Sequence, residues 1–429
     1  MLNRFLLNHR INLPAPWLAV LTIVLLSLAA PITQAAAYEG PLTFNAKDFL
    51  APMALKSANY TIDPTARNDG RMNHYKLSSP FGAIEATGDA MARERAREMD
   101  AIAAIRQIKK TDAFVNGFSA AISGPLEATK TLITKPVQTI GNLGKAAKEM
   151  ASNLMSAISN FGKKESSEDN AMLKDLIGYN KAKRKLAFRL GVDPYSSNPY
   201  LQEELGDLAW ANFAGGATID VAISAATVGG VGATVSAINM GAATGGILLT
   251  KSLTGLTNMN SKYLADMGLT DGATDPFLFH AKYSVAHQTL LVLALGAMTD
   301  VPGRAEFIGL ATLAANETQT RFYQRTAEIM AAYHQQVRPV SRLQVNKGWA
   351  YFQDIDGRVV LPVPADYMAW TTHAQAMTQA LPTAPNRTLW TTGFVSPMTR
   401  SELTARGIGV EEKVFSNKLT DKITIVDPK

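Results

Sequence analysis

The chain has 429 residues, of which 47% are hydrophobic and 18% are charged, a composition typical of a globular protein with about two or three domains. It contains no cysteine, which excludes structural disulfides, thiolate metal sites and thiol catalysis. The formal net charge of +6 is scattered along the chain rather than gathered in a basic tract, so nucleic acid is not an expected partner.

Residues 1–37 have the organisation of a secretory signal peptide. Basic residues precede an apolar run from Trp17 to Ala30, and the segment ends in small residues with the A-x-A spacing at Ala37. The apolar run is shorter than the about 20 residues that a membrane-spanning helix needs. We therefore expect export to the periplasm or cell envelope with cleavage after Ala37. An uncleaved membrane anchor is the alternative.

Residues 38–112 are expected to form a β-hairpin followed by a helix. Turn residues separate strand-like pieces, and the simplest hairpin turns at Asp69-Gly70. From residue 90 to 110, apolar residues recur at helical spacing between oppositely charged residues, which predicts an amphipathic helix. Asp89 stands where the N-cap of that helix is expected.

Residues 113–170 also show apolar residues at helical spacing, but prolines and glycines interrupt the pattern. The segment is basic as well as amphipathic, which leaves two interpretations open. It is either a strap that packs its apolar side on a domain, or a set of helices that lie on an anionic membrane surface. Its last part, residues 163–170, is very polar and is typical of a linker.

Residues 171–337 are expected to form a helical core. One helix covers residues 172–190, and the next begins with Asn198 as N-cap and Pro199 as its first residue. Two further helices are expected over residues 275–298 and 304–336, where helical periodicity is continuous.

Within this core, residues 229–246 read GGVGATVSAINMGAATGG. A dinucleotide loop would need a third glycine and a downstream acid, and both are missing, so no cofactor is expected. The uncharged run from 221 to 250 is long enough to cross a membrane, but its small residues favour close packing of buried helices. We expect a slim buried helix or helix pair. The alternative is a hairpin over residues 212–250 that inserts into a membrane.

Residues 338–429 are expected to form a small α/β domain. Strand-like segments alternate with helical ones, and Ser396-Pro397 opens a helix that Gly407 closes. The fold class is therefore α+β: a mainly helical core domain with an N-terminal β-hairpin plus helix and this small C-terminal α/β domain. The turn Thr391-Thr392-Gly393 follows a predicted strand, and this is the best position for an unrecognised site.

Few residue patterns indicate chemistry. Glu203 and Asp207 lie near the start of one helix, where carboxylates either take part in acid–base catalysis or simply complement the helix dipole, and the dipole is favoured. His280 and His287 are seven residues apart, which is roughly 10 Å along one helix and too far to chelate one ion. They are weak metal candidates, so we expect ordinary helix histidines and no metal.

Other residues are candidates for an interface. Glu317 and Arg321 are spaced as an ion pair on one helical face, with Tyr323 nearby. We expect them to form an exposed intrahelical pair, and the alternative is a polar seam that faces another helix or the C-terminal domain. Trp210, on the same helix as Glu203 and Asp207, is a further interface candidate.

Two segments, LGVDPYSSNPYLQEELGDLAWANFAGG (190–216) and NDGRMNHYKLSSPFG (68–82), resemble a family of uncharacterised exported bacterial proteins. The resemblance covers about the N-terminal two-thirds of the chain. It implies export, and it implies no activity and no role for any residue.

These observations favour an extracytoplasmic interaction or structural protein. The signal peptide indicates the location, and the sequence shows no complete catalytic set. Its expected partner is another envelope protein or a membrane surface. The first alternative is a membrane-active protein that inserts the glycine-rich hairpin. The second is a periplasmic hydrolase of unfamiliar type, with Glu203 and Asp207 as its carboxylates.

Overall fold

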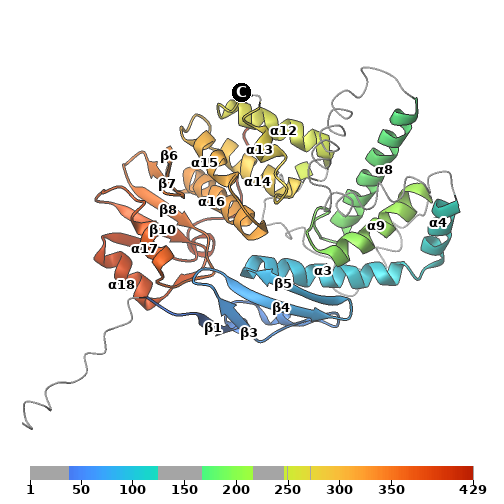
Figure 1. Ribbon diagram of the computed structural model, residues 1–429, viewed down its shortest axis with the longest axis horizontal. Helices are drawn as coiled ribbons and strands as arrows, with labels where there is room; N and C mark the ends of the chain where they lie inside the picture. The colour runs from blue at the N-terminus through green and yellow to red at the C-terminus, as the bar shows by residue number, and fades with distance from the viewer. Residues whose placement is uncertain (1–37, 124–166, 216–245, 249, 271, 429) are drawn as a thin grey trace, which may run out of the picture. The chain divides into compact units, whose positions relative to one another are not determined.

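The computed structural model of the protein describes residues 38–123, 167–215, 246–248, 250–270 and 272–428 (Figure 1). The expected signal peptide, most of the basic strap and most of the glycine-rich segment lie outside these residues. The alternatives for those segments therefore stay predictions. Among the helices that the structure describes, none combines the length and the apolar character needed to cross a membrane.

The N-terminal part contains the expected hairpin, extended into a five-stranded sheet. Its strands are β1 (Leu42–Asn45), β2 (Thr61–Ile62), β3 (Thr65–Asn68), β4 (Asn73–Ser79) and β5 (Gly82–Thr87). β3 and β4 are antiparallel and turn over residues 69–72, where the Asp69 carboxylate accepts hydrogen bonds from the amides of Arg71 and Met72. Alternate residues of β4 are buried, which is the pattern of a sheet with one covered face.

Helix α3 (Asp89–Ile108) covers that face of the sheet, and α9 (Pro199–Ala214) packs on α3 as well (Figure 1). The expectation that Asp89 is the N-cap of α3 is wrong. Gly88 occupies the cap position, and Asp89 is the first residue of the helix. The side chain of Asp89 accepts hydrogen bonds from Tyr75 and Asn73 instead, because these donors lie on the neighbouring strand.

Further helices lie between α3 and the C-terminal sheet. They are α4 (Asp112–Ser123), α8 (Ser167–Arg189), α9 (Pro199–Ala214), α12 (Leu253–Asp266), α13 (Asp275–Leu278), α14 (Val285–Gly296), α15 (Arg304–Ala311) and α16 (Glu317–Gln336). Two short helical segments, Ala46–Asp48 and Pro52–Leu55, precede them. The start of α9 is confirmed, since Asn198 accepts from the amides of Tyr200 and Leu201 and Pro199 is the first helical residue.

Two long helices expected from periodicity are each broken in two. Residues 275–298 form α13 and α14, and Ser284 caps the second of these. Residues 304–336 form α15 and α16, and Asn316 caps the second. In both cases a side-chain oxygen accepts from a backbone amide at the new start, which stabilises a fresh helix end. The hydrophobic spacing continues across both breaks, so periodicity alone does not show them.

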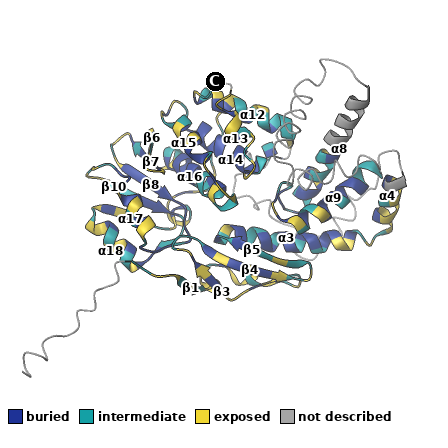
Figure 2. Cartoon of the chain, in the orientation of Figure 1, coloured by how far each residue is buried: buried dark blue, intermediate teal, exposed yellow. Residues whose placement is uncertain are grey.

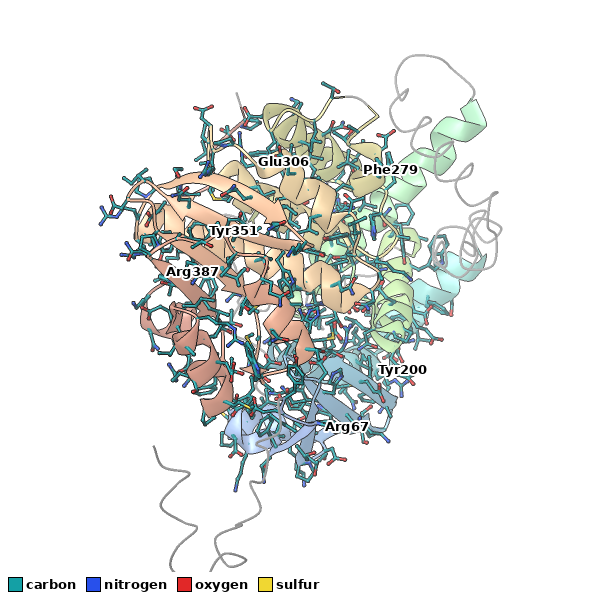
Figure 3. The ribbon with its side chains drawn as sticks, turned by 60° about the vertical axis from the view of Figure 1, so that its left-hand side comes forward. Arg67, Tyr200, Phe279, Glu306, Tyr351 and Arg387 are labelled. Carbon is teal, nitrogen blue, oxygen red and sulfur yellow. The ribbon has the colours of Figure 1, made fainter. Side chains whose placement is uncertain are left out.

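The C-terminal part is built on a five-stranded sheet in the order β12-β10-β8-β7-β6. Its strands are β6 (Val340–Asn346), β7 (Trp349–Asp354), β8 (Val359–Val363), β10 (Arg387–Thr391) and β12 (Ile408–Glu411). β8, β10 and β12 are parallel to one another. β7 is antiparallel to both of its neighbours, β6 and β8. In Figure 3, Arg67 marks the N-terminal sheet, and Tyr351 and Arg387 mark the C-terminal one.

Short elements lie in the connections between the parallel strands and, in the case of α19, after the last of them. These are β9 (Tyr367–Met368), α17 (Thr372–Thr378), β11 (Phe394–Val395), α18 (Pro397–Ala405) and α19 (Val414–Asn417). Ser396 caps α18 and Gly407, with a φ of +68°, follows it, so both expected ends of this helix are confirmed. Together with the helices before it, this arrangement confirms the α+β class.

Helix α16 lies at the centre of the described fold, because it packs on α14 and on β6 and β8. Figure 2 shows α14 as largely buried, and every residue of this helix from Ala286 to Gly296 is buried. The loop between β3 and β4 meets the segment after β8. The amide of Asp366 donates to the carbonyl of Arg71 (3.0 Å), and the amide of Ala369 donates to that of Gly70 (3.0 Å).

Gly393, just after β10, packs closely against the segment that follows β8. A Cβ atom at this position would lie 2.0 Å from the carbonyl oxygen of Asp366 and 2.6 Å from that of Ala365. We expect Gly393→Ala to lower the free energy of unfolding by about 1–3 kcal/mol, measured by urea denaturation. At Gly409 the nearest atoms would be 3.6 Å away, so Gly409→Ala should change stability by less than about 0.5 kcal/mol. Equal effects of the two substitutions would contradict the close approach at Gly393.

Candidate functional site

A cavity of about 400 Å³ lies where the N-terminal sheet, the helices and the C-terminal sheet meet. Its walls come from the loop between β3 and β4, the first turns of α3, residues 191–193, α14, α16, and the segments that follow β8 and β10. A volume of this size is within the range of small-molecule sites.

The cavity lies at the carboxyl ends of two parallel strands. Asp366 comes three residues after the end of β8, and Thr392 and Gly393 come directly after β10. Ligands of α/β sheets bind at this edge, because the loops that leave parallel strands meet there. Of the turn Thr391-Thr392-Gly393 that sequence reasoning singled out by position, Thr392 and Gly393 border the cavity, whereas Thr391 is the last residue of β10.

Two carboxyl groups line this region side by side. The Asp366 carboxylate accepts from the amides of Asn73 (2.9 Å) and Asp89 (3.2 Å), and the Asp89 carboxylate accepts from Tyr75 Oη (2.6 Å) and Asn73 Nδ2 (3.0 Å). Burial, together with the Asp89 charge, raises the pKa of Asp366 well above its usual value. Burial also raises the pKa of Asp89. The pair therefore retains a proton more readily than free aspartates do.

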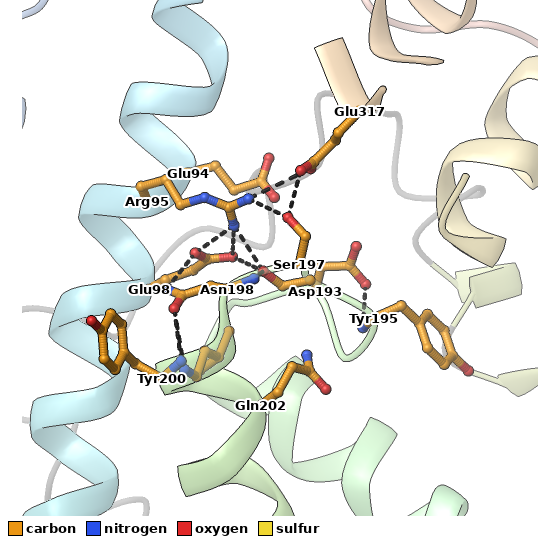
Figure 4. A network of polar contacts seen from close by, with 12 residues as sticks. Glu94, Arg95, Glu98, Asp193, Tyr195, Ser197, Asn198, Tyr200, Gln202 and Glu317 are labelled. Atoms are coloured by element: carbon orange, nitrogen blue, oxygen red, sulfur yellow. Dashed lines mark hydrogen bonds and ion pairs between the residues drawn. The ribbon is translucent and has the colours of Figure 1, made fainter. Parts of the chain in front are cut away.

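A buried network of charges connects α3 to the loop before α9 and to α16 (Figure 4). Arg95 Nη1 donates to Glu98 Oε2 (2.8 Å) and to Ser196 Oγ (2.9 Å). Its Nη2 donates to Ser197 Oγ (2.5 Å) and contacts Glu317 Oε1 at 3.5 Å. The side chains of Arg95 and Glu98 are only 3% and 0% exposed. Such burial is tolerated because each charge has an opposite partner and further hydrogen bonds.

Arg321 continues this network from α16. Its two terminal nitrogens donate to both carboxylate oxygens of Glu94 (2.7 and 3.0 Å), and one of them also donates to Glu317 (2.8 Å). Although burial opposes the charge, the Arg321 guanidinium lowers the pKa of Glu94 to about 2. Of the two interpretations for Glu317 and Arg321, the structure therefore shows the polar seam, which faces α3.

The other interface candidates lie among aromatic rings. Tyr323 packs edge-on against Phe307 and Phe322. Trp210 is 0% exposed and packs against Tyr179 and Phe213 in the core. Trp210 therefore has no surface to offer a partner.

Glu203 and Asp207 lie away from the cavity. Glu203 is exposed at the surface of α9, and Asp207 forms an ion pair with Lys109 (2.9 Å). Glu204 also contacts Lys109 (2.8 Å) and Arg106 (2.6 Å), so the acids of α9 bind the basic residues of α3. This arrangement holds the two helices together, and none of the three carboxylates lines the cavity.

The interpretation that His280 and His287 share one helix is wrong, because α13 ends at Leu278 and α14 begins at Val285. The ring of His280 packs against Tyr283 outside both helices. His287 is buried in α14 and borders the cavity. Across the residues that the structure describes, no group of three or more His, Cys, Asp or Glu side chains could hold a metal ion.

The hydrogen bonds of His287 fix which ring nitrogen carries a proton. Arg325 donates to Glu328 Oε2 (2.6 Å), and Gln324 Nε2 donates to Glu328 Oε1 (2.8 Å), because a carboxylate only accepts. The oxygen of Gln324 therefore faces His287, whose Nδ1–H donates to it. Burial lowers the pKa of His287 to about 4, so its Nε2 carries a lone pair at neutral pH.

Asp193 is a further buried carboxyl on the cavity wall, at 5% exposure. Its Oδ1 accepts from the amide of Tyr195 (2.8 Å). Burial raises the pKa of Asp193 to about 7. This residue therefore changes its charge close to neutral pH.

Neither a family model, nor a curated protein, nor a solved structure matches this chain. A function for it therefore rests on the geometry of the cavity. Sequence reasoning missed Arg71, Asp89, Asp193 and Asp366 as site residues. For Asp366 a signal was present, since it follows the predicted strand GRVVLPVP at its carboxyl end.

Removing Arg321 should destabilise the protein strongly. Arg321→Met leaves Glu94 and Glu317 with little compensation for their burial, and breaking a buried pair in this way costs about 3–5 kcal/mol. Urea denaturation would measure the change. As the control, Arg338→Met removes an exposed pair with Asp356 and should cost less than about 1 kcal/mol. A comparably small loss for Arg321→Met would show that the network contributes no net stability.

Asp193 should make stability fall as the pH rises. Between about pH 4 and 7 the folded state holds a proton that the unfolded state releases, because the pKa of Asp193 is raised from 3.8 to about 7. Asp193→Asn keeps the acceptor for Tyr195 and removes this linkage. The melting temperature of the variant relative to wild type should therefore increase from pH 4 to pH 7 and then level off.

Asp63→Asn is the matched control for that series, because the exposed Asp63 accepts from the amide two residues ahead in the same way (3.0 Å). Comparing the two variants at each pH separates the effect of the Asp193 site from that of exchanging a carboxylate for an amide. A constant difference between Asp193→Asn and wild type would contradict the raised pKa of Asp193.

Proposed function

We propose that this protein is an exported binding protein that takes a small polar molecule into the cavity between α3, α16 and the C-terminal sheet. The observation that carries the proposal is the set of polar groups on the cavity wall at the carboxyl ends of β8 and β10. They include His287, with a lone pair on Nε2, and the carboxyls of Asp193 and Asp366. Convergent polar groups in a concave site are the usual means of orienting a ligand.

Export is the second part of the proposal. It rests on the basic start, short apolar run and A-x-A end of residues 1–37, and on the resemblance to exported bacterial proteins. The envelope partner or membrane surface expected from the sequence stays part of this proposal, as a contact made from outside the cavity.

A second candidate function is hydrolysis in the same cavity, which the neighbouring carboxyls of Asp89 and Asp366 favour. A protonated and an ionised carboxyl side by side are suited to general acid–base catalysis. These two residues would take the place of Glu203 and Asp207, which do not line the cavity. Hydrolysis would appear as a mass change in a compound incubated with wild type but not with Asp89→Asn. Recovery of the unchanged compound from both proteins assigns binding alone.

Blocking the cavity tests the binding function. Ala90, an exposed residue in the first turn of α3, lines the cavity, and Ala90→Trp would place a large side chain there. We expect a small-molecule extract of the native cells to raise the melting temperature of dialysed wild type and not of Ala90→Trp. Ala405→Trp, at an exposed position at the end of α18, should respond like wild type. Equal responses of all three proteins, or no response from any, would refute binding in the cavity.

Fractionation tests export. Expressed with its own leader in a Gram-negative host, the chain should appear in the periplasmic fraction with Tyr38 at its N-terminus, as read by mass spectrometry. Retention in the membrane pellet after a high-pH carbonate wash would favour the membrane-inserting alternative. Recovery of an unprocessed chain from the cytoplasm would overturn export.

A further inference from the structure

We infer that the molecule bound in this cavity is a small organic anion, with a carboxylate or phosphate group, and that the guanidinium of Arg71 binds it. The inference rests on the proposed binding function and names the class of ligand. It follows from which charges around the cavity have partners and which do not.

Two arginines of the cavity wall are matched by carboxylates. Arg321 is paired with Glu94 and Glu317, and Arg325 is paired with Glu328 and Asp421. The guanidinium groups of Arg71 and Arg93 also line the cavity. Within the described part of the chain, neither of these two groups has a hydrogen-bond or ion-pair partner.

Arg71 is held in place without having its donors used. Its guanidinium lies over the ring of Phe322, 5.0 Å from the centroid, and 6.0 Å from that of Trp349. The nearby carboxylate of Asp69 is already engaged by His74 (3.0 Å) and by the amides of Arg71 and Met72. Stacking on an aromatic face fixes the plane of a guanidinium and leaves its in-plane N–H groups available.

Carboxyls and guanidiniums respond differently to burial in this cavity. Burial raises the pKa of Asp89, Asp193 and Asp366, and these groups reduce the cost of burial by taking up a proton. Burial lowers the pKa of Arg71, yet an arginine stays charged at any physiological pH. The charge of Asp69 acts in the opposite direction but does not offset the burial of Arg71, so a bound anion would complete the compensation of its positive charge.

Arg93 strengthens the same preference. Its positive charge lowers the pKa of both Asp89 and Asp366, so it lies near them without donating a hydrogen bond to either. When one of these carboxyls holds a proton, the charge of Arg93 is only partly balanced. A planar carboxylate or a phosphate matches the paired donors of a guanidinium, which makes either group a suitable partner.

The test uses small molecules extracted from the native cells and separated on an anion-exchange resin. Retained and flow-through fractions are added to dialysed wild-type protein, and the melting temperature is measured. We expect the stabilising compound in the retained fraction. Phosphatase treatment of that fraction distinguishes a phosphate ester from a carboxylate. Inorganic phosphate is tested alone in parallel. Loss of the effect assigns a phosphate ester, and its survival assigns a carboxylate.

Variants connect the anion to Arg71. Arg71→Met should need at least about tenfold more of the retained fraction for the same increase in melting temperature, because a charged hydrogen-bonding group is lost. Arg71→Lys keeps the charge without the planar fork and should be intermediate, so it also serves if the methionine variant folds poorly. Arg342→Met removes an exposed arginine outside the cavity and should behave like wild type.

Three outcomes are distinguishable. A stabilising compound in the flow-through fraction would overturn the anion and leave the binding function standing. An anion that stabilises Arg71→Met as well as wild type would remove Arg71 from the site. Failure of every fraction to stabilise wild type would refute the binding function, and the inference with it.

Discussion

The carboxylate of Asp366 determines how the parts of this fold meet. It accepts from the amides of Asn73 and Asp89, which are 293 and 277 residues away along the chain. The N-cap position of α3 is Gly88, which has no side chain to cap the helix, so the carboxyl oxygens of Asp366 accept from the first amide of the helix instead. Because this one group fixes the end of β8 against β4 and α3, it also places the first turns of α3 along the cavity.

The network of Arg95, Glu98, Glu94, Glu317 and Arg321 does the same for the helices. Glu317 and Arg321 are spaced as a local pair on α16, yet Arg321 also binds both oxygens of Glu94 on α3. An exposed local pair contributes little to stability, whereas a buried network is costly unless every charge is matched. Matching these charges requires one relative position of α3, α16 and the loop before α9. The network therefore selects an arrangement of helices as well as stabilising it.

The sequence predicts features whose chemistry is local. Asn198 and Pro199 mark the start of α9 because a cap and the residue it serves are neighbours. The breaks before Ser284 and Asn316 were missed, since the apolar spacing persists across them and a capping residue is common inside loops. Asp366 was missed as a site residue for a different reason. Its partners lie in another part of the chain, and no spacing along the sequence records them, although the predicted parallel strands did locate the correct edge of the sheet.

The buried polar and charged groups of the cavity wall cost stability, and the same groups make the cavity the candidate site. A wall built to hold two helices and two sheets together would gain stability from apolar contacts alone, without the cost of burying charge. This wall instead keeps Arg71 unpaired on Phe322, Asp193 with a pKa raised to about 7, and His287 with a lone pair on Nε2. Under the proposed binding function, a complementary molecule supplies further partners for these groups, so the residues that are costly to bury are also those that would bind it.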